Sequence, residues 1–126
     1  MKLESFWLET APRFSAAPPG PASGRVDVAV IGGGFTGLAA ALACAQRGAS
    51  VTLFESACLG AQASGRNGGQ CNGGLAHDYA ALSRSIGLER TRAYHQAYVA
   101  AVDSVERVVG EEGIDCDFAR SGKMNL

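Results

Sequence analysis

The sequence predicts an α/β fold that opens with one βαβ unit. Three observations predict it. Residues 26–31 (VDVAVI) are short, β-branched and almost continuously apolar, as in a strand buried on both faces of a parallel sheet. A glycine-rich turn at 32–37 leads into the strong helix formers of residues 38–47 (LAAALACAQR). Gly48 ends that helix, and residues 50–54 (SVTLF) form the second strand, reached by a right-handed crossover.

Residues 56–77 depart from a plain dinucleotide fold, in which a helix would come next. This stretch contains six glycines and has no helical period. Irregular stretches longer than about 12–15 residues are uncommon in compact domains and tend to be functional or disordered. Two helices are expected after it. Residues 78–86 have Asp78 as N-cap and Gly87 as terminator. Residues 88–112 carry one apolar stripe that we expect to pack in a core, made of Tyr94, Tyr98, Ala101, Val105 and Val108.

The last residues predict the start of a different sheet. Ile114, Cys116 and Phe118 alternate with Asp115, Asp117 and Ala119, as in a half-buried antiparallel strand. A turn at 121–122 and a partner strand from residue 123 would complete a hairpin. Because the chain stops within that expected strand, we expect it to be the N-terminal portion of a longer protein.

Composition excludes several classes of protein. The chain has 126 residues, 47% hydrophobic and 18% charged, which is typical of a globular domain. The formal net charge of −1 gives no basic surplus for nucleic acid or for an anionic membrane. With no signal peptide and no apolar run of membrane-spanning length, we expect a cytoplasmic protein. Cys44, Cys58, Cys71 and Cys116 lack C-x-x-C spacing, so we expect free, mostly buried thiols and no metal site.

Residues 32–37 form a G-x-G-x-x-G motif. Gly32 permits a sharp turn out of the strand, and Gly34 has no Cβ, so a pyrophosphate can approach the backbone. Gly37 lets the helix pack close to the sheet. The helix N-terminus offers N–H groups and about half a positive charge to phosphates. The motif follows a predicted strand and opens a helix, and this context favours a nucleotide-binding, Rossmann-like unit over a plain glycine turn.

Two further groups support a dinucleotide site. Glu55 ends the second strand, where a carboxylate accepts hydrogen bonds from ribose hydroxyls and repels a 2′-phosphate, which argues against NADP. The alternative is a solvated acid at a strand end. Residues 63–70 (ASGRNGGQ) contain no nucleophile paired with a base. Their backbone N–H groups and amides suit a neutral ring system or its diphosphate; the alternative is a flexible surface loop.

The stretch VDVAVIGGGFTGLAAALACAQRGASVTLFE and the later GAQASGRNGGQ resemble the N-terminal region of FAD-dependent oxidoreductases of the D-amino-acid oxidase type. The likeness extends to FWLETA and EEGIDCDFARSGKMNL, and it is greatest to the gamma-glutamylputrescine oxidoreductase group. The resemblance implies a Rossmann-like FAD-binding βαβ unit with following helices and the start of an antiparallel substrate-domain sheet. It implies an FAD-binding domain at 26–113 and a truncated hairpin at 114–126, while the four prolines of residues 1–25 predict an extended N-terminal arm.

The resemblance also implies cofactor-binding residues, position by position. Those expected around the diphosphate are Gly32, Gly34, Phe35, Thr36 and Gly37, and Glu55 is expected at the adenosine ribose. Those expected at the ribityl and ring end of the flavin are Ser64, Arg66, Asn67, Gly68, Gly69 and Gln70. Some relatives carry a histidine in this loop that bonds covalently to the flavin. This chain has Asn67 there, so the resemblance implies non-covalent FAD.

The activity implied is oxidation of the C–N bond of a small-molecule amine or amino acid, with a γ-glutamylputrescine-like substrate favoured. Family members are much longer, so the catalytic and substrate-binding residues are expected beyond Leu126. Two alternatives stay open: an NAD-binding domain of another dehydrogenase, and a non-catalytic truncated remnant. The sequence assigns no nucleic-acid or membrane partner and leaves the oligomeric state open.

Overall fold

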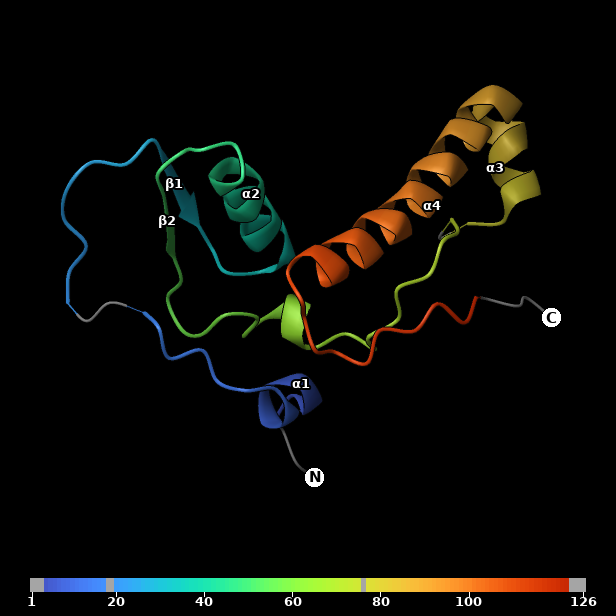
Figure 1. Ribbon diagram of the computed structural model, residues 1–126. Coiled ribbons are helices and arrows are strands. Elements are labelled where there is room, and N and C mark those ends of the chain that lie inside the picture. The colour runs from blue at the N-terminus through green and yellow to red at the C-terminus, as the bar shows by residue number, and fades with distance from the viewer. Residues whose placement is uncertain (1–3, 18–19, 76, 123–126) are drawn as a thin grey trace. The chain divides into compact units, whose positions relative to one another are not determined.

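The structure, a computed structural model, describes residues 4–17, 20–75 and 77–122. The elements follow in the order α1 (Phe6–Thr10), β1 (Val28–Ile31), α2 (Phe35–Ala45), β2 (Val51–Phe54), the 3-10 helix η1 (Ala63–Gly65), α3 (Tyr79–Ile86) and α4 (Leu88–Glu111) (Figure 1). The chain divides into two compact units, residues 1–68 and 69–126, and each is described by itself. No helix in the described ranges is long and apolar enough to cross a membrane.

The first unit contains the expected βαβ arrangement. β1 and β2 pair in parallel, with Val28 opposite Val51 and Ile31 opposite Phe54, and α2 packs on both strands. Side-chain hydrogen bonds between Asp27 and Ser50 join the two strands at the start of the sheet. One carboxylate oxygen of Asp27 accepts the backbone N–H of Ser50 at 2.9 Å and its hydroxyl at 2.7 Å. The hydroxyl bond, with the backbone bond second, lowers the pKa of Asp27.

Burial of β1 differs from the expectation. Its residues alternate between half-buried and exposed, and Ile31 is 81% exposed. The prediction of a strand buried on both faces is therefore wrong for the described structure, in which β2 and α2 are the elements that pack closely on β1. α2 also begins three residues earlier than predicted, so Gly37 lies in its first turn.

The N-terminal arm, predicted to be extended, contains the short helix α1. Its first turn is closed by the Glu9 N–H, which donates to the carbonyl of Ser5 at 3.1 Å. The hydroxyl of Thr10 donates to the carbonyl of Phe6 at 2.9 Å. Five residues seldom hold a helix by themselves, because nucleation is costly. α1 packs on η1, and tertiary contact therefore supports it.

The second unit is a helical hairpin followed by an irregular segment. Asp78 caps α3 as predicted, since its Oδ1 accepts the N–H of Ala81 at 2.7 Å. Gly87 separates α3 from α4 with φ of 87°, a conformation that favours glycine. The predicted helices at 78–86 and 88–112 are confirmed to within one residue at each end.

The predicted apolar stripe of α4 is not buried. Tyr94 is 56% exposed, Tyr98 46% and Val105 41%, whereas the buried residues of this helix are Thr91 and Val102. The expectation of core packing for the stripe is wrong in the described structure. Helical spacing shows which residues share a face, but only a neighbouring element buries that face.

The predicted antiparallel strand at 114–119 is also wrong: residues 114–122 contain no strand. Asp117 has φ of 51°, which interrupts an extended backbone. A strand is held by hydrogen bonds to a neighbour. The expected partner, from Lys123 on, lies outside the described residues.

Candidate cofactor site

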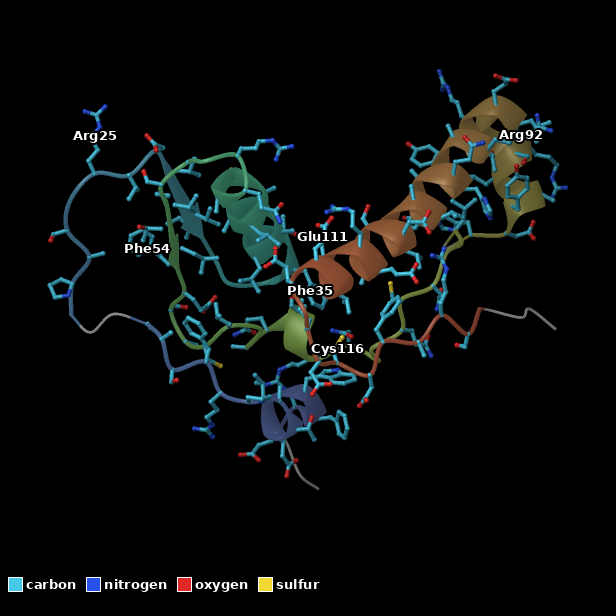
Figure 2. The ribbon with its side chains drawn as sticks, viewed as in Figure 1. Arg25, Phe35, Phe54, Arg92, Glu111 and Cys116 are labelled. Carbon is cyan, nitrogen blue, oxygen red and sulfur yellow. The ribbon has the colours of Figure 1, made fainter. Side chains whose placement is uncertain are left out.

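The two parallel strands end at the same edge of the sheet, and a hollow of about 280 Å³ lies there. Its lining comes from both strand ends and from the residues that follow them: Ile31, Gly32, Phe54, Glu55 and Ser56. Phe35 and Phe54, labelled in Figure 2, are 66% and 40% exposed. Ligands of doubly wound folds bind beyond the carboxyl ends of the strands, so the hollow lies where a nucleotide is expected.

The glycine turn meets two of its three predicted requirements. Gly32 has φ of +101°, in the region that L side chains rarely adopt. A Cβ on Gly37 would lie 1.9 Å from the Gly32 carbonyl oxygen, so α2 starts in direct contact with the turn. At Gly34 a Cβ would lie 2.9 Å from the Ser64 hydroxyl oxygen. The small size of Gly34 therefore makes room for this serine as well as for any phosphate.

Glu55 is organised by the glycine turn itself. Its Oε2 accepts the N–H of Gly33 at 2.8 Å, and its Oε1 accepts the N–H of Ala57 at 2.9 Å. These two bonds, the first being the larger cause, lower the pKa of Glu55. Ser56 Oγ donates a third, weaker bond at 3.3 Å. The backbone N–H of Ser56 also lowers this pKa, so a ribose hydroxyl would share or replace one of the two weak Ser56 interactions.

Ser64 lies at the N-terminus of α2. Its Oγ accepts the N–H of Phe35 at 3.0 Å, which satisfies the first N–H of the helix. The backbone N–H groups of Thr36 and Gly37 lie in the same first turn of α2 and likewise have no acceptor within the helix. Because Ser64 accepts this bond, its own hydroxyl hydrogen is directed elsewhere. The arrangement suits the diphosphate end of a dinucleotide better than the ribityl end expected from the resemblance.

Two side chains of the rest of the loop within the first unit donate to the loop's own backbone. The Asn67 side-chain amide donates to the Ser64 carbonyl. Arg66 is exposed, and its Nε donates to the Ala61 carbonyl at 3.4 Å. A Cβ at Gly68 would meet nothing within 4 Å. Gly69 and Gln70 are exposed residues of the second unit, so their predicted place at the flavin stays a prediction.

Sequence reasoning missed a group of buried glycine contacts. Gly33 is buried, donates to Glu55 and accepts the N–H of Gly60 at 3.0 Å, which ties the loop to the turn. A Cβ at Gly65 would lie 2.0 Å from the Gly60 carbonyl oxygen. The five-residue spacing between Gly60 and Gly65 could have suggested a close backbone contact, but the sequence does not show which glycines pack together.

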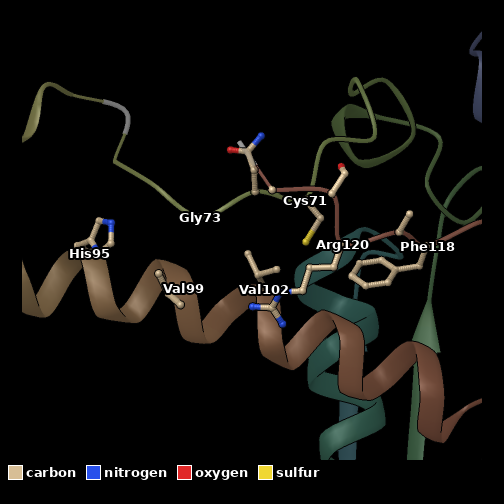
Figure 3. A pocket seen from close by; sticks show the side chains of 11 residues that line it. Cys71, Gly73, His95, Val99, Val102, Phe118 and Arg120 are labelled. Atoms are coloured by element: carbon tan, nitrogen blue, oxygen red, sulfur yellow. The ribbon is translucent and has the colours of Figure 1, made fainter. Parts of the chain in front are cut away.

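A second hollow, of about 260 Å³, lies within the second unit (Figure 3). His95, Val99 and Val102 line it from α4, and residues 71–73 and 118–122 complete it. Its cation, Arg120, pairs with Asp103 at 2.5 Å and also with Glu106. Both acids, with the Asp103 hydrogen bond as the larger cause, raise the pKa of Arg120. The charge of Arg120 is thereby neutralised within the unit itself.

The four cysteines are free thiols, but the expectation that most are buried is wrong. Cys44 is half-buried, and Cys58, Cys71 and Cys116 are exposed. Within the described ranges no group of three or more histidine, cysteine and acidic residues is arranged to hold a metal ion.

The donors present fit FAD. Helix N–H groups and a hydroxyl at the start of α2 match a diphosphate, and an ionised carboxylate at the neighbouring strand end matches a ribose. A Cβ on Gly33 would lie 2.5 Å from Leu59 Cδ2, and one on Gly37 would lie 1.9 Å from the Gly32 carbonyl oxygen, so the turn beside these donors packs this closely only with glycine at both positions.

Comparison with curated proteins agrees with this geometry. The chain is 30% identical over 118 residues to the gamma-glutamylputrescine oxidoreductase of Escherichia coli, covering 94% of this chain and 28% of that protein. It is 29% identical to the probable oxidoreductase OrdL of Haemophilus influenzae, covering 94% of this chain and 27% of that protein. Over 65 residues it is 51% identical to OrdL of Rhizobium meliloti, covering 51% of this chain and 15% of that protein.

The chain thus spans 28% and 27% of the length of the first two relatives. No solved structure matches it significantly. The family profile described as FAD dependent oxidoreductase matches residues 27–126, which include the whole βαβ unit and the glycine loop. On this match and the site geometry, the chain belongs to the FAD-dependent oxidoreductase family.

Proposed function

We propose that the first unit binds FAD non-covalently, as part of an enzyme that oxidises the C–N bond of an amine. The observation that carries the proposal is the convergence of the glycine turn, Glu55 and Ser64 at the carboxyl edge of the sheet. The first-turn N–H groups of α2 and the Ser64 hydroxyl would hold the diphosphate. Glu55 would hold the adenosine ribose.

The loop after Ser64 supports the same proposal. Arg66, Asn67 and Gly68 extend from the diphosphate end and would continue along the cofactor. Asn67 stands where covalent relatives have a histidine, and an amide forms no bond of that kind with a flavin. Gly69 and Gln70 would follow them. Acid precipitation of the flavin-loaded protein would then release all the flavin, and flavin left on the precipitated chain would contradict non-covalent binding.

FAD bound there would supply the electron sink that accepts a hydride from the carbon next to the substrate nitrogen. The nitrogen loses a proton, and water hydrolyses the resulting imine to an aldehyde or keto acid plus an amine or ammonia. The residues of this chain bind and orient the cofactor. None of the residues assigned here forms an acid–base pair, and a neutral amine needs none for hydride donation.

Among amines we favour γ-glutamylputrescine, with simple amino acids second, because one relative carries that substrate in its name and covers 94% of this chain. The test is to mix the intact natural protein anaerobically with γ-glutamylputrescine, other amines and amino acids. We expect the oxidised flavin absorbance to bleach with γ-glutamylputrescine.

Two results would contradict the proposal. If no amine or amino acid bleaches the flavin while NADH or a hydroxy acid does, amine oxidation is wrong. If the protein is colourless and binds NADH tightly, the site is a pyridine-nucleotide site of another dehydrogenase. Putrescine itself is the matched control for substrate choice, because it lacks only the glutamyl group.

A further inference from the structure

The N-terminal segment contacts the candidate flavin loop through two side chains that lie sixty residues away in sequence. The indole N–H of Trp7 donates to the backbone carbonyl of Asn67 at 2.8 Å. The hydroxyl of Ser5 donates to the backbone carbonyl of Gly65. Ser5 is 8% exposed, although it precedes a helix of only five residues. We call Ser5 and Trp7 the N-terminal clasp.

The clasp acts on a loop that is already fixed on its other side. Gly65 packs against the Gly60 carbonyl so closely that a Cβ would lie 2.0 Å from its oxygen. Gly60 in turn donates to the Gly33 carbonyl in the glycine turn at 3.0 Å. The backbone between Gly60 and Asn67 is therefore held between the glycine turn and the N-terminal segment.

The side chains expected to meet the cofactor stand on this held stretch. Ser64 lies next to Gly65, and its Oγ accepts the Phe35 N–H at 3.0 Å. The Asn67 side chain donates to the Ser64 carbonyl, so the carbonyl and the amide of Asn67 connect Trp7 to Ser64. The clasp itself contributes no group to the hollow at the strand ends.

We propose that Ser5 and Trp7 are positioning residues for the FAD site: they hold the backbone of residues 64–67 so that Ser64 and Asn67 are presented to the cofactor. The inference rests on the proposed function. It assigns a role to the N-terminal segment, which precedes the residues matched to the family. Positioning of this kind lowers the cost of ordering the loop when the ligand binds.

The experiment uses the intact natural protein, its flavin removed, titrated with FAD while flavin fluorescence is followed. Trp7→Phe keeps an aromatic ring but loses the N–H donor. Ser5→Ala loses the hydroxyl, and Ser5→Thr keeps it. Loss of one neutral hydrogen bond corresponds to an affinity roughly three- to tenfold lower, which we expect for Trp7→Phe and Ser5→Ala. Ser5→Thr should restore affinity to near the wild-type value.

The control is Phe14→Leu, a change to an aromatic residue of the same arm that is 64% exposed. It should leave FAD affinity unchanged. Thermal melting of each apoprotein separates positioning from general stability, because positioning weakens FAD binding of the folded protein. A double-mutant cycle between Trp7→Phe and Ser64→Ala should be non-additive, since Asn67 links the two residues.

Wild-type affinity in both Trp7→Phe and Ser5→Ala would overturn the inference while leaving FAD binding intact. The inference is also wrong if both variants only lower the melting temperature, with no rescue by Ser5→Thr. Absence of FAD binding by the wild-type protein would overturn the proposed function, and this inference with it.

Discussion

At the scale of single residues, we propose that Glu55 performs two tasks with one carboxylate. It accepts N–H groups from Gly33 and Ala57, which shapes the turn after the strand, and a ribose hydroxyl would share or replace its weak bond to Ser56. Such bifunctional residues show mixed phenotypes, because a substitution disturbs both the fold of the turn and the binding of the ligand.

Glu55→Ala should therefore weaken FAD binding by roughly ten- to a hundredfold in the intact protein. Glu55→Gln keeps an acceptor for the Gly33 N–H but loses the charge, so its loss should be smaller. Titration of the apoprotein with FAD measures both. Unchanged affinity in Glu55→Ala would remove this residue from the site.

The lowered pKa of Glu55 predicts how the stability of the folded protein depends on pH. Because backbone N–H groups lower the pKa of its carboxyl below 4.5, the ionised group stabilises the folded state above that pH. This contribution is lost as the pH falls through the lowered pKa of the folded state. Apoprotein carrying Glu55→Gln should melt below wild type near neutral pH, and the difference should close in acid. If the difference in melting temperature stays constant with pH, the effect does not come from the charge of Glu55.

At the scale of elements, the site depends on close contact between backbones. α2 begins against the glycine turn, and η1 is packed against Gly60. These approaches need glycine at positions 37 and 65 for steric reasons, whereas a Cβ at Gly68 or Gly110 would meet open space.

Gly37→Ala and Gly65→Ala should each destabilise the protein by about 1–3 kcal/mol, because the new methyl group displaces a backbone carbonyl. Both should also weaken FAD binding by roughly the same free energy, which corresponds to about five- to 150-fold. Gly110→Ala is the matched control: Gly110 lies within α4 with nothing within 4 Å of a Cβ. It should stabilise the helix by about 0.5–1 kcal/mol. Thermal melts and FAD titrations measure these effects. If Gly37→Ala changes the melting temperature and the FAD affinity no more than Gly110→Ala does, the packing argument is wrong.

At the scale of the whole molecule, the described chain buries little apolar surface. Val102 is the one buried hydrophobic residue in the described ranges, while Ile31, Phe6, Phe14 and Phe35 are each more than half exposed. Among the described residues the sheet has two strands, and each strand has one edge without a paired strand. Two-stranded sheets are marginally stable without added packing.

The 126-residue chain, produced by itself, should therefore be poorly soluble and should not retain stoichiometric flavin after purification. Size-exclusion chromatography and the flavin absorbance spectrum are the measurements. A soluble, yellow, monomeric product would show that these exposed surfaces need no further partner. The same chain carrying Gly110→Ala controls for helix stability alone.

The sequence by itself determined the βαβ unit, the two later helices, the Asp78 cap and the FAD-dependent family. These features depend on local patterns: apolar runs, helix formers, capping residues and glycine spacing act over a few residues. Local pattern also indicated Glu55 as a candidate ribose ligand, because this residue directly follows the second predicted strand of the βαβ unit.

Only the tertiary structure decided which residues meet across long sequence separations. It placed Ser64 at the start of α2, joined Gly33 to Glu55 and Gly60, and brought Ser5 and Trp7 onto residues 65 and 67. It also left the α4 stripe and one face of β1 exposed and formed no strand at 114–122. The physical reason is the same in each case: a pattern specifies a face or a donor, and only the fold supplies its partner.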